Sequence, residues 1–526
     1  MQRHEMVAAR PRGARASGAE GLRVLFLPKN SRTAYFQSFL AAARVRARWD
    51  IRVVAPKPAC RLWRDAVTGD DKFHLVPDFN DRQGWEDDPK RVAEIDAFIA
   101  ECEQATGISA GRIVLAGERD LGRGYSRRIY YWFHNKTARR ALADNTEPFR
   151  ILRRMFAFAR DILDASRPDI VLAGEWADAL CFTFYLVARR MGIPCVVNRY
   201  SKILSGRCFW STEPLMYNGA RLVKAAEKRQ EGAPISDRAR EHIRKFRDCP
   251  TMIGYLRAVW NKMDRSSWIK RHVDVGKAIA GEARHHLLRY GGQPPKPGLQ
   301  LLLDHYRRPW LEWRNAKFFR RYDDEALTCL PYIYTALHKD PEQALNYQAP
   351  NWTYQMYTIG LLSSCLPSSY RLLVREHRTN TSRRPPRFYR EMGALPGVTL
   401  IDGYDDQFKY IRHADLIITD NGSIGWEGIL LGRRVITFTN TFYDGSGLEH
   451  RVREPEELAA TVVEMLKQPP VKDPTAHDEA LGWLLDAEWE ASAPLDSADH
   501  VEALDLLREL LDSGSMSQPQ SQLQAG

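Results

Sequence analysis

Apolar residues in the first part of the chain form short runs separated by stretches with helical spacing. The runs at 22–27 and 50–55 have the length of buried strands, and residues 33–48 between them have the spacing of a helix. Strand, helix and strand in this order form a βαβ unit, which implies a parallel sheet. A second such unit is expected with strands at 169–173 and 195–197 and a helix at 177–191. We therefore predict one doubly wound α/β domain over residues 21–215.

The same alternation returns in the second half of the chain. Gly432 follows one of the expected helices, at a position where a glycine commonly ends a helix. Residues 329–470 are thus expected to form a second Rossmann-like domain. Its strands are expected at 331–337, 370–375, 398–401, 414–419 and 435–438, and its helices at 352–366, 407–413 and 424–431.

Three further segments lie outside these two domains. Residues 1–20 are small, polar and rich in arginine, which is typical of a disordered leader. Residues 216–328 have helical spacing and an excess of basic side chains, and we interpret them as a basic helical connection. Residues 471–526 are expected to form an acidic helical tail whose Ser- and Gln-rich end is frayed.

Composition excludes collagen-like, coiled-coil, mini-protein and wholly disordered classes. Of the 526 residues, 44% are hydrophobic and 27% charged, which are ordinary values for a globular protein. A chain of this length can fold without stabilising disulfides or metal ions. No uncharged apolar run reaches the ~18 residues of a membrane span, and the N-terminus lacks the apolar core of a secretory signal. The eight cysteines follow no zinc-ligand or disulfide spacing. These patterns favour a cytoplasmic protein with reduced thiols.

The charge is unevenly distributed. The formal net charge is +11, although residues 454–526 carry sixteen acidic and three basic residues, so the rest of the chain carries +24. Such a surface attracts nucleotide phosphates, nucleic acid, anionic lipid or an acidic polymer, and a solvated basic surface is the alternative. Trp260, Trp268, Trp310 and Trp313 lie among the basic residues of 216–328. This pattern indicates contact with an anionic membrane surface, unless these tryptophans are buried in a helical bridge.

Three of the expected strands in the second domain end in polar clusters. Ligands of open α/β sheets bind beyond the carboxyl ends of the strands, so we expect these side chains to meet in one crevice. The candidates, in chain order, are His338 and Glu342, then Glu376 and His377, then Gly422, Ser423, Gly425 and Glu427.

The last of these clusters has the clearest chemistry. Gly422 and Gly425 allow a ligand to approach the backbone closely, and Ser423 stands where a helix begins. Free amides and the positive end of the helix dipole favour a phosphate there, although a plain helix cap would have the same sequence. Glu427 could accept hydrogen bonds from ribose hydroxyls, or be a surface glutamate. His377 could donate to a phosphate oxygen, or be a core histidine bonded to the backbone.

From about 331 to 443, the sequence resembles the capsule polysaccharide biosynthesis proteins, a family that includes Kdo transferases of bacterial capsule assembly. The resemblance rests on three segments. Residues 337–342 (LHKDPE) are similar to the family's LH/LQ-x-x-PE strand end, 375–378 (REHR) to its K-E-H-P, and 422–435 to its G-T/S-x-G-x-E-A-L-x-x-G-x-P-V element. It extends weakly to 119–125 and 174–175 in the first domain.

This resemblance implies a GT-B-like α/β fold, in which two Rossmann-like doubly wound domains face a cleft, with a helical insertion between them. It further implies a metal-independent glycosyltransferase of capsular or surface polysaccharide biosynthesis. Such an enzyme has no cofactor and takes a nucleotide-sugar donor, CMP-linked for Kdo, and a saccharide or glycolipid acceptor. His377 would contact the nucleotide phosphate, with Gly422 and Ser423 on the opposite oxygens. Two family prolines are replaced by Arg378 and Arg434, which leaves CMP, UDP and CDP donors open.

Glycosyl transfer needs a charge sink for the leaving phosphate and a carboxylate near the anomeric carbon. A helix N-terminus and basic side chains are expected to form the sink, because no Asp-Asp pair follows an expected strand as a DxD motif. The carboxylate is expected from the first domain, with Glu175 as the first candidate for general base, then Asp120 and Asp178. Arg119 and Arg123 are candidates to bind an anionic acceptor or a donor carboxylate.

Other function classes fit the same residues. A polyol-phosphate transferase with a CDP-activated donor would use the same phosphate contacts. A non-catalytic scaffold of capsule assembly or export would have a decayed cleft, which Arg378 in place of proline mildly favours. Nucleic-acid binding ranks last, because the sequence has no RNP, helix-turn-helix or zinc signature. The predicted location is cytoplasmic, with peripheral contact to the inner membrane and to capsule assembly partners left open.

Overall fold

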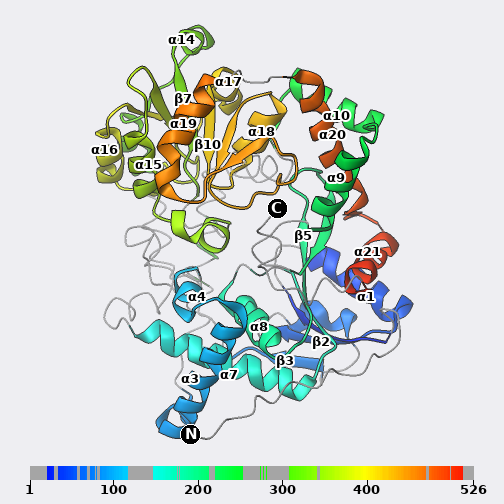
Figure 1. Cartoon of the computed structure of the whole chain (residues 1–526). Coiled ribbons are helices and arrows are strands. Elements are labelled where there is room, and N and C mark those ends of the chain that lie inside the picture. The colour runs from blue at the N-terminus through cyan, green and yellow to red at the C-terminus, as the bar shows by residue number, and fades with distance from the viewer. Residues whose placement is uncertain are drawn as a thin grey trace, which may run out of the picture.

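The described residues of the computed structural model form two α/β domains, each built on its own β-sheet (Figure 1). The structure describes residues 21–28, 33–55, 60–67, 72–77, 79, 83–116, 146–174, 176, 178–212, 219–252, 273, 276–277, 280, 307, 309–339, 344–468, 473–497 and 499–512.

The first sheet contains five parallel strands, extended at one edge by two antiparallel ones. Across the sheet the strands are β13 (Ala493–Pro494), β6 (Arg207–Ser211), β5 (Cys195–Tyr200), β4 (Ile170–Ala173), β1 (Arg23–Leu27), β2 (Asp50–Ala55) and β3 (Phe73–Leu75). The strand order therefore reverses between β1 and β4, which is the topological switch point of a Rossmann sheet.

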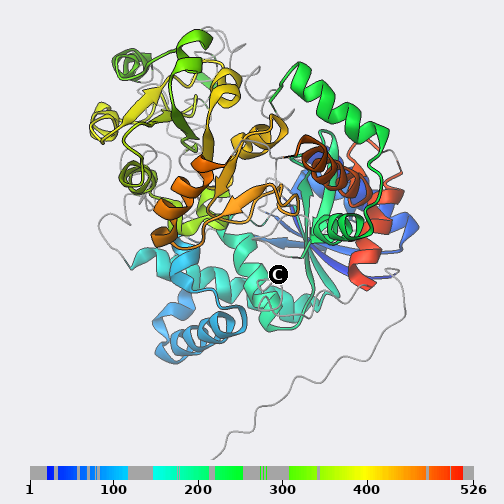
Figure 2. The same ribbon diagram turned by 45° about the horizontal axis from the view of Figure 1, so that its top comes forward.

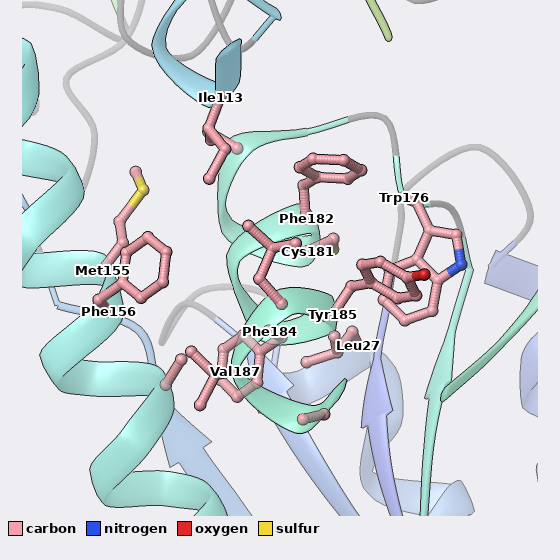
Figure 3. Close-up of a cluster of buried hydrophobic side chains, with 14 of the residues drawn as sticks. Leu27, Ile113, Met155, Phe156, Trp176, Cys181, Phe182, Phe184, Tyr185 and Val187 are labelled. Atoms are coloured by element: carbon pink, nitrogen blue, oxygen red, sulfur yellow. The ribbon is translucent and has the colours of Figure 1, made fainter. Parts of the chain in front are cut away.

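Both faces of this sheet are buried, which explains why its strands are almost continuously apolar. Leu25 and Leu27 of β1 belong to one core cluster, part of which is drawn in Figure 3, and Val24 and Phe26 belong to another. Successive strand residues point to opposite faces, so each cluster fills one side. The helices of this domain are α1 (Thr33–Arg46), α3 (Pro89–Thr106), α4 (Ala110–Ala116), α7 (Glu147–Ser166) and α8 (Ala179–Arg190), with 3-10 turns at Arg61–Ala66 and Gly84–Asp87.

The second sheet has six strands, all parallel. Across the sheet they are β12 (Glu449–Arg451), β11 (Val435–Thr437), β10 (Leu416–Thr419), β7 (Tyr332–Ala336), β8 (Arg371–Arg375) and β9 (Val398–Ile401). In chain order this is the 3-2-1-4-5-6 arrangement of a Rossmann domain. The order reverses between β7 and β10, so a ligand is expected beyond the carboxyl ends of these two strands.

Helices pack on both faces of the second sheet, and alternate residues of β7 again enter different core clusters. A π-helical turn at Ala344–Gln348 and a 3-10 turn at Pro350–Trp352 follow β7, and a second 3-10 turn lies at Pro455–Glu457. The helices are α14 (Asp324–Cys329), α15 (Gln355–Ser364), α16 (Pro386–Gly393), α17 (Gln407–His413), α18 (Ser423–Leu430) and α19 (Leu458–Lys467).

The chain crosses between the domains twice. After β6, α9 (Gly219–Glu231) and α10 (Asp237–Asp248) pack against α20 (Pro474–Glu490), as Figure 1 and Figure 2 show. Beyond α20, β13 pairs with β6 and α21 (Val501–Asp512) packs on the first domain, where the Trp210 indole donates to the Ala503 carbonyl at 2.7 Å. The segment expected as an acidic tail therefore returns to the first domain and adds a strand to its sheet.

The predicted fold class, with two Rossmann-like α/β domains, is confirmed. Every strand and helix expected from the sequence within 21–55, 169–197 and 331–438 is present, and its ends agree to within about three residues. All eight cysteines are free thiols, four of them buried. Within the described part of the chain, no helix is both long and apolar enough to cross a membrane.

Candidate functional site

The three polar clusters lie at the same edge of the second sheet. β10, β7 and β8 are neighbours in that order and run parallel, so their carboxyl ends share one edge. Asp420 follows β10, His338 follows β7 and His377 follows β8. The first two flank the switch point of the sheet, which is the position that doubly wound folds use for ligands.

His338 is fixed through both of its backbone groups. Its N–H donates to Oε1 of Gln355 at 2.8 Å. Its carbonyl accepts from Nδ2 of Asn380 at 3.2 Å and from Nη2 of Arg384 at 3.0 Å. The imidazole Nε2 lies 3.5 Å from Oδ2 of Asp420, and both side chains are about nine-tenths buried, with 11% and 7% exposed. This imidazole therefore has a defined place beside a carboxylate.

His377 has a defined tautomer. Its Nδ1 accepts from the backbone N–H of Thr379 at 3.3 Å and lies 2.8 Å from the Thr379 hydroxyl oxygen. Because a backbone N–H donates only to an unprotonated ring nitrogen, the proton of the neutral imidazole is on Nε2. His377 is half-buried, so it is placed to present an N–H donor at the sheet edge. The neighbouring Arg378, which replaces the family proline, stacks its guanidinium over the Tyr404 ring at 4.5 Å.

The third cluster begins a helix, as expected. Gly422 is the N-cap of α18, and its N–H donates to the Thr419 hydroxyl at 3.0 Å. Gly422 and Ser423 are half-buried. Asn421 donates from Nδ2 to Oε1 of Gln348 at 3.1 Å, which ties this loop to the π-helical turn after β7. The first turn of α18 thus supplies backbone donors and a positive helix end at the same edge as His377.

Gly425 has a packing reason to be glycine. A Cβ at this position would lie 2.0 Å from Oη and 2.7 Å from Cζ of Tyr443. Residue 425 is buried, and Tyr443 occupies the space in which we had expected a ligand to approach the backbone. The packing against Tyr443 is enough to explain the glycine, and a ligand contact at Gly425 stays a prediction.

The two candidate glutamates of these clusters lie inside the domain. Glu427 is 1% exposed and accepts from Nε2 of Gln407 at 2.8 Å, so it does not face open solvent beside the helix as we had expected. Burial raises the pKa of Glu427 to about 8, although Arg375 and the Ser423 hydroxyl lower it. Burial likewise raises the pKa of Glu376, against the charge of Arg384. Both are buried acids under the site rather than groups on its surface.

The described first-domain candidate is a helix cap. Asp178 is the N-cap of α8, and its Oδ1 accepts from the Cys181 N–H at 2.7 Å. β4 ends at Ala173 beside β1, at the switch point of the first sheet. The other candidates, Glu175, Asp120, Arg119 and Arg123, lie outside the described residues, as does Glu342 of the second domain. Their catalytic and binding roles stay predictions.

Several residues that organise the site carried no sequence signal. Gln355, Asn380 and Arg384 hold the backbone of His338. Gln355 belongs to α15, whereas Asn380 and Arg384 lie in the loop between β8 and α16. Tyr347 packs its ring 5.2 Å from that of Phe182 in α8, and so joins the site loops to the first domain. These contacts depend on tertiary proximity. The only signal in the sequence is the residue types themselves, two amides and an arginine.

The Asp-Asp pairs at 87–88, 323–324 and 405–406, which are among the described residues, have local structural roles. Asp88, Asp323 and Asp406 are N-caps of α3, α14 and α17, and each accepts a backbone N–H of its own helix. Within the described ranges, no group of three His, Cys, Asp or Glu side chains is arranged to hold a metal ion. A metal-free mechanism stays a prediction.

The cavity beside His338 is small. Gln355, Thr358, Thr419 and Asp420 line it with His338, and its volume of about 10 Å³ is that of a single water. This cavity therefore has no room for a nucleotide.

Two of the four singled-out tryptophans are exposed. Trp310 and Trp313 belong to the helical residues 309–316 and are 48% and 76% exposed. Arg314 stacks over the Trp310 ring at 4.9 Å. These two are therefore not buried in a helical bridge. Trp260 and Trp268 lie outside the described residues.

No protein-family model and no curated protein sequence matches the chain. Among solved structures, it is similar to the β-Kdo 2,7 transferase KpsC of Thermosulfurimonas dismutans, with 11% identity over 68% of this chain and 89% of that one and a TM-score of 0.31. It is also similar to the UDP-GlcNAc 2-epimerase of Neisseria meningitidis bound to UDP-GlcNAc, with 12% identity over 93% and 100% of the two chains and a TM-score of 0.28. Similarities of this size identify no family, so the argument for function rests on the residues of the site.

Proposed function

We propose that the protein is a glycosyltransferase that binds a nucleotide-activated sugar at the carboxyl edge of its second sheet. The observation that carries this proposal is the meeting of His338, His377 and the first turn of α18 on three adjacent strand ends. Two imidazoles and a helix N-terminus at a Rossmann switch point suit a diphosphate or monophosphate ester.

Each group has a role in stabilising the leaving phosphate. The Nε2–H of His377 donates to one phosphate oxygen, and the backbone amides at Ser423 donate to another. His338, beside Asp420, supplies a second imidazole at the switch point. These donors are fixed before the ligand arrives, so no reorganisation is needed as charge develops on the leaving group. A carboxylate of the first domain, Glu175 first among the candidates, would deprotonate the acceptor hydroxyl.

The finer assignment is a sugar transfer in capsular or surface polysaccharide synthesis, with Kdo from a CMP-linked donor as the first candidate. It rests on the resemblance of 337–342, 375–378 and 422–435 to the capsule proteins. The two arginines that stand in place of the prolines of the capsule proteins make other contacts. Arg378 stacks on Tyr404, and Arg434 donates to the Asp415 carbonyl at 2.7 and 3.0 Å.

We further propose that the acceptor is reached at a membrane surface, through the outward face of residues 309–316. Trp310, Trp313, Arg314 and Lys317 recur at helical spacing on this face, and all four are exposed. Indole rings favour the lipid headgroup region, and the two cations favour anionic lipids. A glycolipid acceptor would be presented at such a surface.

The test is thermal stability of the full chain with CMP, CDP, UDP, GDP and their sugar conjugates, with His377→Ala beside the wild type. A ligand at about 100 times its Kd adds roughly 2.7 kcal/mol to the free energy of unfolding, which raises Tm by several degrees. The matched control is His450→Ala, because His450 is an exposed histidine on β12, at the far edge of the same sheet.

Each outcome assigns a function. A shift with CMP that His377→Ala loses and His450→Ala keeps supports Kdo-like transfer. A shift with CDP favours polyol-phosphate transfer, and one with UDP favours a hexose or hexosamine donor. No shift with any nucleotide, from folded protein, would overturn the donor site, and a non-catalytic scaffold of capsule assembly would then be the better proposal.

A further inference from the structure

A cavity lies at the opposite edge of the second sheet from the candidate donor site. Its volume is about 530 Å³, within the range of small-molecule sites. Arg433 and Arg434 directly precede β11, and Ser446 and Gly447 precede β12, so the cavity is at the amino ends of these parallel strands. Helices α9 and α20, which pack against each other, supply further lining residues.

Two of the three arginines that line this cavity are not used by the fold. Arg434 donates to the carbonyls of Asp415, Met465 and Gln468, and is therefore structural. Arg229 and Arg433 are different. Among the residues that the structure describes, no carboxylate lies within 4 Å of either guanidinium.

Arg433 is partly desolvated without compensation. Its Nε is buried and has no hydrogen-bond acceptor among the described residues. Burial lowers the pKa of Arg433 and outweighs Tyr332 and Asp415, which both favour its charge. A desolvated guanidinium charge without a carboxylate partner is costly, and an anion bound beside it in the cavity would offset that cost. Arg229 lies against Gly447, since a Cβ added to this glycine would be 2.7 Å from Nη1 of Arg229.

The rest of the lining suits hydroxyl groups and a ring. Glu479 is exposed on α20, and Asp473 uses one oxygen to cap that helix, with Oδ1 accepting from the N–H groups of Thr475 and Ala476. Carboxylates accept hydrogen bonds from hydroxyls. The Trp483 indole also lines the cavity, and its N–H donates to the Ala233 carbonyl at 2.6 Å, which fixes the ring. Two guanidiniums, two carboxylates and an aromatic wall match a ligand with one anionic group and several hydroxyls.

We propose that this cavity is a second binding site, which takes an anionic monosaccharide such as a sugar phosphate or a sugar acid. Arg229 and Arg433 bind the anionic group, and Asp473 and Glu479 accept from ring hydroxyls. The site is separate from the donor site, since the two lie at opposite edges of the same sheet. Occupation of one can therefore be measured while the other is disabled.

The experiment is isothermal titration calorimetry of the full chain with glucose 6-phosphate, glucuronate, inorganic phosphate and glucose. We expect saturable binding of glucose 6-phosphate or of glucuronate, weaker binding of phosphate, and none of glucose. Arg229→Gln and Arg433→Gln should each weaken binding about tenfold or more, because each removes a charge-assisted contact. Arg229 is exposed, so Arg229→Gln leaves the fold intact even if Arg433→Gln does not.

Two controls separate this site from other basic surface. Arg371→Gln changes an exposed arginine on β8 and should leave the titrations unchanged. His377→Ala removes phosphate binding at the donor edge, so the binding that this variant retains belongs to the cavity. Tighter binding of glucose 6-phosphate identifies a phosphate ester, and tighter binding of glucuronate identifies a sugar acid. Phosphate binding as tightly as both sugars would overturn the sugar site, and binding that survives both arginine variants would overturn the site altogether.

Discussion

Nε2 of His338 lies 3.5 Å from Oδ2 of Asp420, across the point at which the strand order of the second sheet reverses. His338 follows β7 and Asp420 follows β10, so the pair joins the first and fourth strands of this Rossmann domain. The carboxylate orients the imidazole and compensates its charge when it is protonated. A phosphate can then approach this edge without meeting an isolated negative charge.

We therefore expect Asp420→Asn to weaken nucleotide binding about tenfold, because it removes the negative charge that faces the His338 imidazole. The amide keeps the size of the side chain and one acceptor oxygen, so Tm without ligand should stay close to that of the wild type. Calorimetric titration of the nucleotide that shifts Tm is the measurement. Unchanged affinity would show that the His338–Asp420 contact is structural only.

Stability should fall with rising pH because of Glu427. Burial raises the pKa of Glu427 to about 8, whereas an unfolded glutamate titrates near 4.3. Between these values the folded state holds a proton that the unfolded state has released, so this contribution to stability is present at pH 4 and is lost as pH rises towards 8. Glu427→Gln has no proton to lose. Its free energy of unfolding should therefore rise relative to that of the wild type between pH 5 and pH 8.

Urea unfolding of both proteins across this pH range measures the difference. Glu464→Gln is the matched control, because Glu464 is an exposed glutamate on α19. That variant should parallel the wild type at every pH. Parallel curves for Glu427→Gln as well would mean that the Glu427 carboxyl is ionised in the folded state at neutral pH.

The strand ends could be predicted from sequence, but the burial of the side chains behind them could not. Strands with both faces buried have a continuous apolar pattern, and parallel topology forces their carboxyl ends to one edge. This made the edge of His338 and His377 predictable. Glu427 differs, because its place depends on Gln407 of another helix. The same is true of β13, whose two residues pair with β6 from nearly 300 positions away and leave no local pattern.

The aromatic face of residues 309–316 should bind anionic membranes. We expect the protein to float with vesicles that contain phosphatidylglycerol and not with pure phosphatidylcholine. Arg314→Gln with Lys317→Gln removes two cations, each worth about 1 kcal/mol near an anionic surface, so partitioning should fall roughly thirtyfold. Trp310→Ser with Trp313→Ser should lower the partitioning further, at low and at high ionic strength. Tyr357→Ala, at a 55% exposed ring on α15, is the control, and equal flotation of all variants would remove the membrane contact.

Gly425 and Gly360 should respond oppositely to alanine. At Gly425 a Cβ would overlap the Tyr443 side chain, so Gly425→Ala should lose about 1–3 kcal/mol of stability. At Gly360, inside α15, a Cβ meets nothing within 4 Å, and alanine should add up to about 1 kcal/mol through helix propensity. Tyr443→Phe removes Oη and should recover part of the loss at 425. If Gly425→Ala keeps its stability but loses nucleotide binding, the glycine serves the ligand and not the packing.

The two connections between the domains are joined by a buried ion pair between α9 and α20. Nη1 of Arg221 lies 3.2 Å from Oε2 of Glu488, with 2% and 1% of the two side chains exposed, and Nη2 donates to the Asp444 carbonyl at 3.2 Å. Removing one partner leaves a buried charge without compensation, so Glu488→Ala should cost about 3–5 kcal/mol.

The same two helices provide the control for this prediction. Lys228 and Glu490 form a more exposed pair at 2.7 Å, with 24% and 42% of the side chains exposed, and Lys228→Ala should cost less than about 1 kcal/mol. Urea unfolding followed by tryptophan fluorescence compares the two variants. The double change Arg221→Met with Glu488→Leu should recover most of the stability, because a packed apolar pair needs no charge compensation. Equal losses in the single buried and exposed variants would mean that solvent reaches Arg221 and Glu488.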